Sequence, residues 1–224
     1  IQLLDDDDQL LPRKIKTQIE KFQESDGIGV LYCGMVWETG ATVLPDEELQ
    51  GNVLNQVLTL SSSPCITSGL LIKKEFLTEI HPIPSYPAST DEVLKIELAQ
   101  LTQFDYVDEP LIIRGVGEDN VSRSMKTIDV SWQLLEDYES LYNERPENVR
   151  AKAISNTYYS ESEIHLNKNF WSLRARWLLI YSLYKSPDID RRSIALLLRS
   201  FGGKYAVGIA SIIEDVINKV QFRN

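Results

Sequence analysis

The sequence predicts an α/β fold followed by a region made only of helices. Runs rich in β-branched and aromatic residues, such as residues 28–37, alternate with helix-like segments as far as residue 126. After that point the hydrophobic spacing is helical, in segments 128–144, 147–160, 168–186 and 189–222. A content of 43% hydrophobic and 25% charged residues is ordinary for a globular protein. We therefore expect two regions, residues 1–126 and 127–224.

Local patterns define the expected elements of the first region. Residues 1–4 have the apolar content of the end of a buried strand, and Pro12 stands in the opening turn of a helix that continues to Phe22. The turn signal Asp26-Gly27 leads into a strand over 28–37. The remaining elements are an amphipathic helix over 49–60, a strand over 65–72, a short helix to Ile80, a loop over 81–90, a helix from Asp91, and two short strands, 104–107 and 111–114, split by Pro110.

Charge, cysteine and histidine content argue against several functional classes. The formal net charge of -10 disfavours nucleic acid as the main partner, because binding to the phosphate backbone needs a basic surface. Cys33 and Cys65 form no CxxC pair, and His81 and His165 are isolated, so zinc and disulfide scaffolds are weak interpretations. The sequence has no apolar run of roughly 18 to 20 residues and no signal-peptide pattern. We expect a cytoplasmic protein, either soluble or peripheral at the cytoplasmic face of the membrane.

The run Asp5-Asp6-Asp7-Asp8 is the tightest concentration of charge in the chain. It lies in the expected turn between a strand and a helix. In open α/β sheets such turns gather ligand-binding groups at the carboxyl ends of the strands. Carboxylate oxygens suit Mg²⁺ or Mn²⁺, and such an ion usually shares its shell with substrate phosphates. The alternative is a solvated acidic loop, or acidic residues placed favourably at a helix N-terminus.

The acidic run is followed by Pro12, Lys14 and Gln18, and this spacing closely resembles the DxD region of family 2 glycosyltransferases. The resemblance implies that residues 1–126 are the C-terminal part of a GT-A, Rossmann-like nucleotide-sugar domain, followed by the helical region. In the family, earlier strands hold the nucleotide base and an early aspartate. Those strands have no counterpart in this sequence, so we expect an N-terminally incomplete domain.

Within this resemblance the aspartates of the run take different roles. Asp5 and Asp7 match the two acids of the DxD motif. The resemblance implies that Asp5 contacts the nucleoside end of the sugar donor. It also implies that Asp7 binds the divalent cation, Mg²⁺ or Mn²⁺, that bridges the diphosphate. Asp6 and Asp8 are then expected to serve local structure.

Further segments resemble the family in the expected order. The segment 65–72 resembles the strand that floors the acceptor side of the site, and the resemblance makes Thr67, Ser68 and Gly69 the expected acceptor-binding residues. Their small side chains would let a sugar approach closely. The stretch 104–111 resembles the closing strand of the family's core.

The stretch 91–99 resembles the family helix that opens with a Glu-Asp pair, which makes Asp91 the expected catalytic base. Thr90 stands where the glutamate of that pair is expected, so Glu92 is a second candidate for the base. The alternative for Asp91 is an N-cap or first-turn acid, which is favoured at this position without any catalytic role.

Arg114 and the stretch 120–124 resemble a segment that folds over the donor phosphates in many relatives. A guanidinium there would offset the charge of the leaving group. The alternative is that Arg114 is a surface residue in an ion pair.

The resemblance as a whole implies an inverting glycosyltransferase. Such an enzyme moves a sugar from a nucleotide-sugar donor to a hydroxyl of a glycan, a polysaccharide or a lipid-linked glycan. The alternative is a non-catalytic interaction module derived from a truncated glycosyltransferase, and the absence of the earlier strands supports it. The acidic motif, the acceptor segment and the acidic helix follow one another in the family's order. This order favours the enzyme over the interaction module, because a protein that only binds a partner does not need all three.

The segment 168–204 is rich in Lys and Arg, although the chain as a whole is acidic. Its basic residues are interleaved with Trp171, Trp177, Tyr181 and Tyr184. Basic, aromatic helices can rest on anionic lipid surfaces, so peripheral membrane contact is one interpretation. The other is that the aromatic side chains form the core of a helical bundle and the arginines its solvated face.

Overall fold

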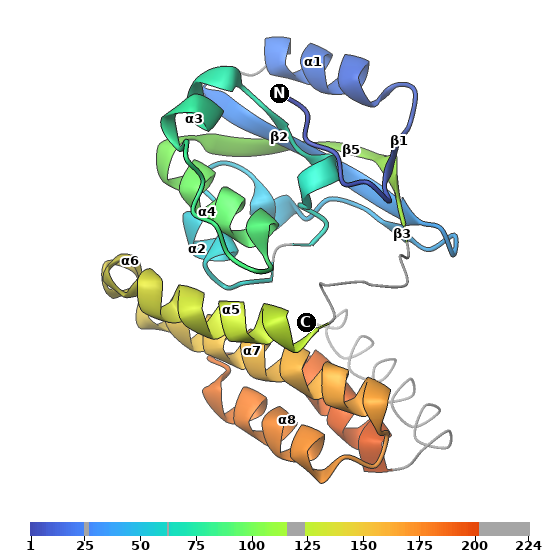
Figure 1. The fold of residues 1–224 in the computed structure, drawn as a ribbon, viewed down its shortest axis with the longest axis vertical. Helices are drawn as coiled ribbons and strands as arrows, with labels where there is room; N and C mark the ends of the chain where they lie inside the picture. The colour runs from blue at the N-terminus through green and yellow to red at the C-terminus, as the bar shows by residue number, and fades with distance from the viewer. Residues whose placement is uncertain (25–26, 62, 116–123, 202–224) are drawn as a thin grey trace, which may run out of the picture. The chain divides into compact units, whose positions relative to one another are not determined.

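The computed structural model describes residues 1–24, 27–61, 63–115 and 124–201 (Figure 1). The chain divides into two compact units, Ile1–Ser131 and Trp132–Asn224, and the division falls within helix α5 (Met125–Asp137). The first unit combines helices with a mixed sheet, so the expected α/β class is confirmed. In the second unit every described element is a helix.

Strand β2 (Ile28–Trp37) is central to the sheet and is buried along most of its length. It pairs in parallel with β5 (Gln103–Arg114) on one side. On its other side it pairs antiparallel with β4 (Leu71–Ile72) near its start and with β3 (Thr42–Val43) near its end. The short strand β1 (Gln9–Leu10) pairs antiparallel with β5. The sheet therefore places β5 between β1 and β2.

The expected break at Pro110 was wrong, because β5 is one continuous strand of 12 residues. The pairing with β2 shifts register on both sides of the Gly34–Pro110 pair. Proline has no backbone N–H to donate to a sheet, so it is tolerated within a strand at such an irregularity. A Cβ on Gly34 would stand 2.8 Å from the carbonyl oxygen of Val43, so only glycine fits at this shift.

Two other expected elements are shorter than the sequence predicts. The expected strand over 65–72 is a strand only in β4, and Thr67–Gly69 forms a 3-10 turn. The expected helix over 49–60 is reduced to α2 (Leu54–Val57), preceded by the 3-10 turn Glu47–Leu49. Between them Gly51 has a φ of 77° and exchanges both backbone hydrogen bonds with Phe104, at 2.7 and 2.9 Å. This backbone conformation suits glycine and interrupts a helix.

The other helices of the first unit agree with the sequence to within two residues at their starts. Helix α1 (Lys14–Glu24) lies on one side of the sheet, and α2 and α4 (Thr90–Leu101) lie on the other (Figure 1). Helix α3 (Lys74–Glu79) follows β4. Residues 81–89 are a loop, as expected. The core between sheet and helices is aliphatic, with Val93, Leu94, Ile96 and Leu98 of α4 nearly inaccessible to solvent.

The second unit consists of the end of α5, α6 (Glu139–Asn143), α7 (Glu147–Lys168), α8 (Leu173–Lys185) and a helical stretch over 191–201. The expected helix 128–144 is divided at Tyr138, and α7 continues well beyond the expected end at residue 160. Helices α7 and α8 approach closely through small hydroxyl side chains: the hydroxyl of Ser155 donates to the carbonyl of Ser182 at 2.9 Å, and the hydroxyl of Ser182 donates to the carbonyl of Ser155 at 2.9 Å. The expected helical residues 202–222 lie outside the described part of the chain.

The aromatic residues expected in the bundle core are largely on the surface of the described structure. Trp171, Trp177 and Tyr184 are 63%, 62% and 78% exposed. Tyr181 is 50% exposed, although its ring stacks on Tyr158. Across the described ranges, no helix is both long and apolar enough to cross a bilayer.

Candidate functional site

The acidic run forms a tight loop that is anchored at both of its ends. Residues 1–4 lie along β4, where Gln2 bridges Leu71. At the start of the loop, the N–H of Asp5 donates to the hydroxyl oxygen of Ser68 at 3.0 Å. At its end, a carboxylate oxygen of Asp8 accepts the N–H of Gly115 at 3.0 Å. Both anchors come from segments remote in sequence, so tertiary packing decides the shape of the loop.

Gly115 packs directly against the acidic loop. A Cβ on this residue would stand 2.3 Å from the carbonyl oxygen of Asp7, so no other amino acid fits without displacing the loop. Asp8 is only 8% exposed, whereas Asp5, Asp6 and Asp7 are exposed. Asp8 therefore supports the loop, and the other three carboxylates face outward.

Lys14 and Gln18 explain the spacing that follows the acidic run. Both are fully buried on α1, one helical turn apart. The Lys14 ammonium donates to the carbonyl of Leu70 at 3.3 Å and to the side-chain oxygen of Gln2, and burial lowers the pKa of Lys14 to about 8. The Gln18 amide donates to the carbonyl of Gly69 at 3.0 Å. These side chains tie α1 to the segment that carries Ser68.

Asp91 belongs to the same neighbourhood as the acidic loop, although it starts a different helix. Partial loss of solvation raises the pKa of Asp5, and so do the nearby carboxylates of Asp8, Asp91 and Asp7. The guanidinium of Arg114 opposes them and lowers it. The structure therefore brings together the two predicted DxD residues, the predicted catalytic aspartate and the predicted donor-site arginine.

Asp91 and Glu92 differ in how they are held. Both face Lys95, a buried residue of α4, whose ammonium lies 3.2 Å from a carboxylate oxygen of Glu92 and 3.9 Å from one of Asp91. Burial works against the charge on Lys95, but the two carboxylates outweigh it and raise the pKa of Lys95. Glu92 is the closer partner and the less exposed of the two. Asp91 is thus the more accessible and the more loosely paired of the two carboxylates.

Arg114 stands at the end of β5, immediately before Gly115. Its guanidinium lies over the ring of Trp37, 4.8 Å from the ring centroid. This stacking holds the cation beside the acidic loop, where it acts on Asp5. Most of the stretch expected to follow it in the donor site, residues 120–123, lies outside the described residues.

The three residues expected to bind the acceptor lie in the 3-10 turn that supports the acidic loop. Ser68 and Gly69 are buried, and Thr67 is half-buried. The hydroxyl of Ser68 accepts the N–H of Asp5, and its carbonyl accepts the side-chain amide of Gln2 at 3.0 Å. A Cβ on Gly69 would meet only ordinary van der Waals contacts. Among these three residues, Thr67 has the most solvent access.

The donor chemistry of the loop suits a divalent cation. Within the described ranges, no group of three or more His, Cys, Asp or Glu side chains is placed so that it could hold a metal ion by itself. The exposed side chains of Asp5 and Asp7 supply hard carboxylate oxygens, and the carboxylates of Asp8 and Asp91 are close enough to act on Asp5. Mg²⁺ is typically held by one or two carboxylates together with substrate phosphates, so these residues fit such an ion.

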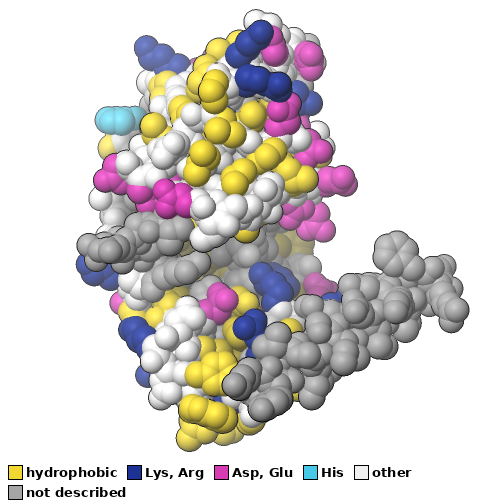
Figure 2. Space-filling view, turned by 90° about the vertical axis from the view of Figure 1, so that its right-hand side faces the viewer, with side chains coloured by type: hydrophobic (Ala, Val, Ile, Leu, Met, Phe, Trp, Pro, Cys, Tyr) yellow, Lys and Arg dark blue, Asp and Glu magenta, His cyan; other side chains and the backbone are white. Residues whose placement is uncertain are grey.

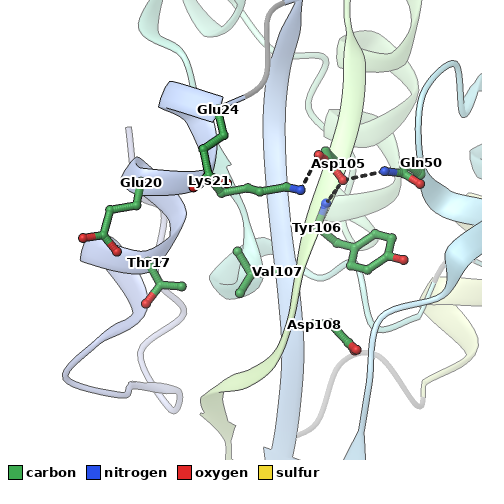
Figure 3. Close-up of a pocket in the computed structure, with 9 residues that line it drawn as sticks. All are labelled: Thr17, Glu20, Lys21, Glu24, Gln50, Asp105, Tyr106, Val107 and Asp108. Carbon is green, nitrogen blue, oxygen red and sulfur yellow. Dashed lines mark hydrogen bonds and ion pairs between the residues drawn. The ribbon is translucent and has the colours of Figure 1, made fainter.

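A separate pocket of about 360 Å³ lies between α1 and the first half of β5 (Figure 3). Its buried acid, Asp105, is satisfied by the protein: it lies 3.2 Å from the Lys21 ammonium and accepts from the Gln50 amide at 2.9 Å and the Tyr106 N–H at 2.8 Å. None of the residues predicted for the functional site lines this pocket. The candidate site is therefore the acidic loop with Asp91 and Arg114.

Three residues shape the site in ways that the sequence analysis did not predict. The place of Gly115 could have been predicted, because a glycine directly after a long strand often marks a position where another backbone segment approaches closely. Lys95 was expected only as part of a helix, and its burial beside Asp91 had no local signal. For Ser68 the expected acceptor contact stays a prediction, and the structure adds that its hydroxyl accepts the N–H of Asp5, a contact that no local pattern indicates.

Comparison of the chain with protein-family models, with curated proteins and with solved structures finds no match. The function is therefore argued from the site itself.

Proposed function

We propose that this chain carries the catalytic core of an inverting, family 2-like glycosyltransferase of the GT-A type. One observation carries the proposal: Asp5, Asp7, Asp91 and Arg114 share one neighbourhood, although they come from the start of the chain, from α4 and from the end of β5. An acidic loop that was merely solvated would need neither the Asp91 carboxylate nor the Arg114 guanidinium beside it. A carboxyl group whose pKa is raised by burial and by neighbouring carboxylates, as for Asp5, is typical of a functional site.

The proposed reaction is a single displacement at the anomeric carbon of a nucleotide sugar. Asp91 accepts the proton of the acceptor hydroxyl while the hydroxyl oxygen attacks the anomeric carbon. The bond from that carbon to the diphosphate oxygen breaks, and the nucleoside diphosphate leaves with the bonding electrons. Because attack and departure occur on opposite faces, the configuration inverts. The acceptor is a hydroxyl of a glycan, a polysaccharide or a lipid-linked glycan.

The remaining residues act on the donor. Asp5 contacts its nucleoside end, and the Arg114 guanidinium offsets the negative charge that develops on the leaving group. Asp7 would hold Mg²⁺ or Mn²⁺, which supplies further positive charge against the diphosphate when bound. Ser68, Lys14 and Gln18 keep the loop and its supporting turn in place.

The test is to measure release of nucleoside diphosphate from a panel of nucleotide sugars by the full-length gene product, with Mn²⁺ or Mg²⁺ present. Asp91→Asn should lower kcat by about 10²- to 10⁴-fold, because the general base is lost, while binding of the donor is kept. Asp7→Ala should abolish both transfer and dependence on the cation.

Glu92→Gln is the matched control, since Glu92 neighbours Asp91 and shares Lys95 with it. It should reduce kcat far less than Asp91→Asn. If Glu92→Gln lost activity while Asp91→Asn kept it, the general base would be Glu92 instead of Asp91. Full activity in both Asp91→Asn and Asp7→Ala, or no turnover of any donor by the wild type, would contradict the proposal and favour an interaction module.

A further inference from the structure

Helix α8 is apolar on two opposite faces. One face is buried and packs into the second unit through Ala175, Leu178, Leu179 and Ser182. The other is exposed and carries large apolar side chains at helical spacing: Leu173, Trp177, Ile180, Tyr181 and Tyr184, which are 69%, 62%, 42%, 50% and 78% exposed. A soluble helix normally presents polar residues to water on the face opposite its core. An exposed apolar stripe of this kind marks a binding surface.

The same region is strongly basic. Residues 168–201 contain seven Lys and Arg against two Asp, a net charge of +5 within a chain whose net charge is -10. The six exposed members of this set are Lys168, Arg174, Lys185, Arg191, Arg192 and Arg199. Arg174 and Arg192 lie in ion pairs with Glu161 and Asp190. Figure 2 shows basic and hydrophobic side chains on the surface of the second unit, in the lower part of the view.

Two further exposed aromatic side chains, Trp171 and Phe201, contact the same cation. The Arg176 guanidinium lies over the rings of both Trp171 and Phe201, 5.6 and 4.5 Å from their centroids, and donates to the carbonyl of Ser200. Both rings stay about 60% exposed, at 63% and 60%. Arg176 thus holds two aromatic rings at the surface without burying them.

We propose that this face of the second unit, formed by α8 with residues 168–172 and 186–201, docks on an anionic lipid surface. Trp and Tyr prefer the membrane–water interface, where an apolar ring can enter the lipid while its polar edge stays hydrated. Lys and Arg around them are attracted to anionic headgroups. A second copy is a poor occupant, because a symmetric dimer through this face would bring together two surfaces that each carry an excess of exposed Lys and Arg. The inference is independent of sugar transfer.

The proposal is tested by co-sedimentation of the full chain with vesicles of phosphatidylcholine alone or mixed with phosphatidylglycerol, at low and high salt. The wild type should bind the anionic vesicles at low salt, lose binding at high salt, and bind neutral vesicles weakly. Trp177→Ala with Tyr184→Ala removes apolar anchors, and Lys185→Glu with Arg191→Glu reverses charges. Each pair should weaken the apparent affinity about tenfold or more.

The matched control is Lys16→Glu with Leu44→Ala, which changes an exposed cation and an exposed apolar residue of the first unit. It should bind as the wild type does. Because all six substituted residues are on the surface, circular dichroism should show each variant folded. The proposal would be overturned if the wild type did not bind vesicles, or if it bound neutral and anionic vesicles equally. It would also be overturned if the wild type bound no vesicles but formed a dimer that the Trp177 and Tyr184 substitutions abolish.

Discussion

Asp5 illustrates how single residues in this site work against stability. Its N–H is fixed by Ser68, and its carboxylate is left beside those of Asp7, Asp8 and Asp91. Partial burial and these carboxylates raise the pKa of Asp5, and the Arg114 guanidinium lowers it without cancelling their combined effect. A fold that needed only a stable loop would not collect these carboxylates. Such local conflict is common where function competes with stability.

The raised pKa of Asp5 predicts a pH-dependent gain in stability for Asp5→Asn. Above the ordinary value of 3.8, the unfolded chain releases the Asp5 proton more readily than the native state does. The free energy of unfolding therefore falls as pH rises through the interval between 3.8 and the raised native pKa. Asp5→Asn should thus be more stable than the wild type at pH 7, and the gain should shrink towards pH 4.

Urea denaturation at a series of pH values measures this difference directly. Asp6→Asn is the matched control, because Asp6 is an exposed aspartate of the same run. It should leave the free energy of unfolding nearly unchanged. An Asp5→Asn variant that is less stable than the wild type at pH 7 would show that the crowding around Asp5 is not repulsive.

At the level of elements, one helix start in the second unit is stabilised by a side-chain cap. Asp190 precedes the helical stretch 191–201 as its N-cap: one carboxylate oxygen accepts the N–H of Arg192 at 3.1 Å and the other accepts the hydroxyl of Ser193 at 2.7 Å. Burial raises the pKa of Asp190, but the Ser193 hydrogen bond and the Arg192 charge outweigh burial and lower it. The charged form of Asp190 therefore stabilises the helix.

Asp190→Ala should lower the free energy of unfolding by about 0.5–2 kcal/mol, the usual cost of losing an N-cap. Because the native pKa is lowered, this contribution is present above pH 3.8 and is lost as pH falls through the native pKa. Thermal unfolding at pH 7 and pH 3 would measure both effects. Asp188→Ala, which removes a neighbouring exposed carboxylate, should change little. An equal loss in both variants would exclude the capping role.

At the scale of the whole molecule, the two units differ in core and in charge. The first contains the sheet core around Cys33, Met35 and Ile112, and the second packs Leu166 against Ala175 and Leu179. Residues 1–131 contain 10 basic and 22 acidic residues, a net charge of -12, whereas residues 132–224 contain 13 and 11, a net charge of +2. The acidic site and the basic face thus belong to different units.

Separate cores predict separable unfolding. Gly115→Ala forces a Cβ against Asp7 and should destabilise the first unit by about 1–3 kcal/mol, the usual cost of overpacking. In differential scanning calorimetry, Gly115→Ala should lower the midpoint temperature of one unfolding transition, and Asp190→Ala should lower that of another. Trp177→Ala, at an exposed position, should move neither. A single transition shifted equally by both destabilising variants would mean that the units unfold together.

Local sequence patterns correctly predicted the α/β class, the buried strand 28–37 and the starts of α1 and α4, because these depend on hydrophobic spacing and turn residues. The resemblance of the acidic run to a known family also predicted Asp5, Asp7 and Asp91 as residues of one functional site, and their roles stay a prediction. Their proximity was only a prediction at that level, since nothing local relates the start of the chain to α4.

Tertiary structure decided the features that depend on contacts between distant segments. Pro110 lies inside a continuous β5 because pairing with β2 absorbs the irregularity. Ser68 belongs to a turn that holds Asp5, and the exposed face of α8 reflects packing of its opposite face. The spacing of apolar residues predicts a helix or a strand, but it does not say which of two apolar faces the rest of the chain will cover.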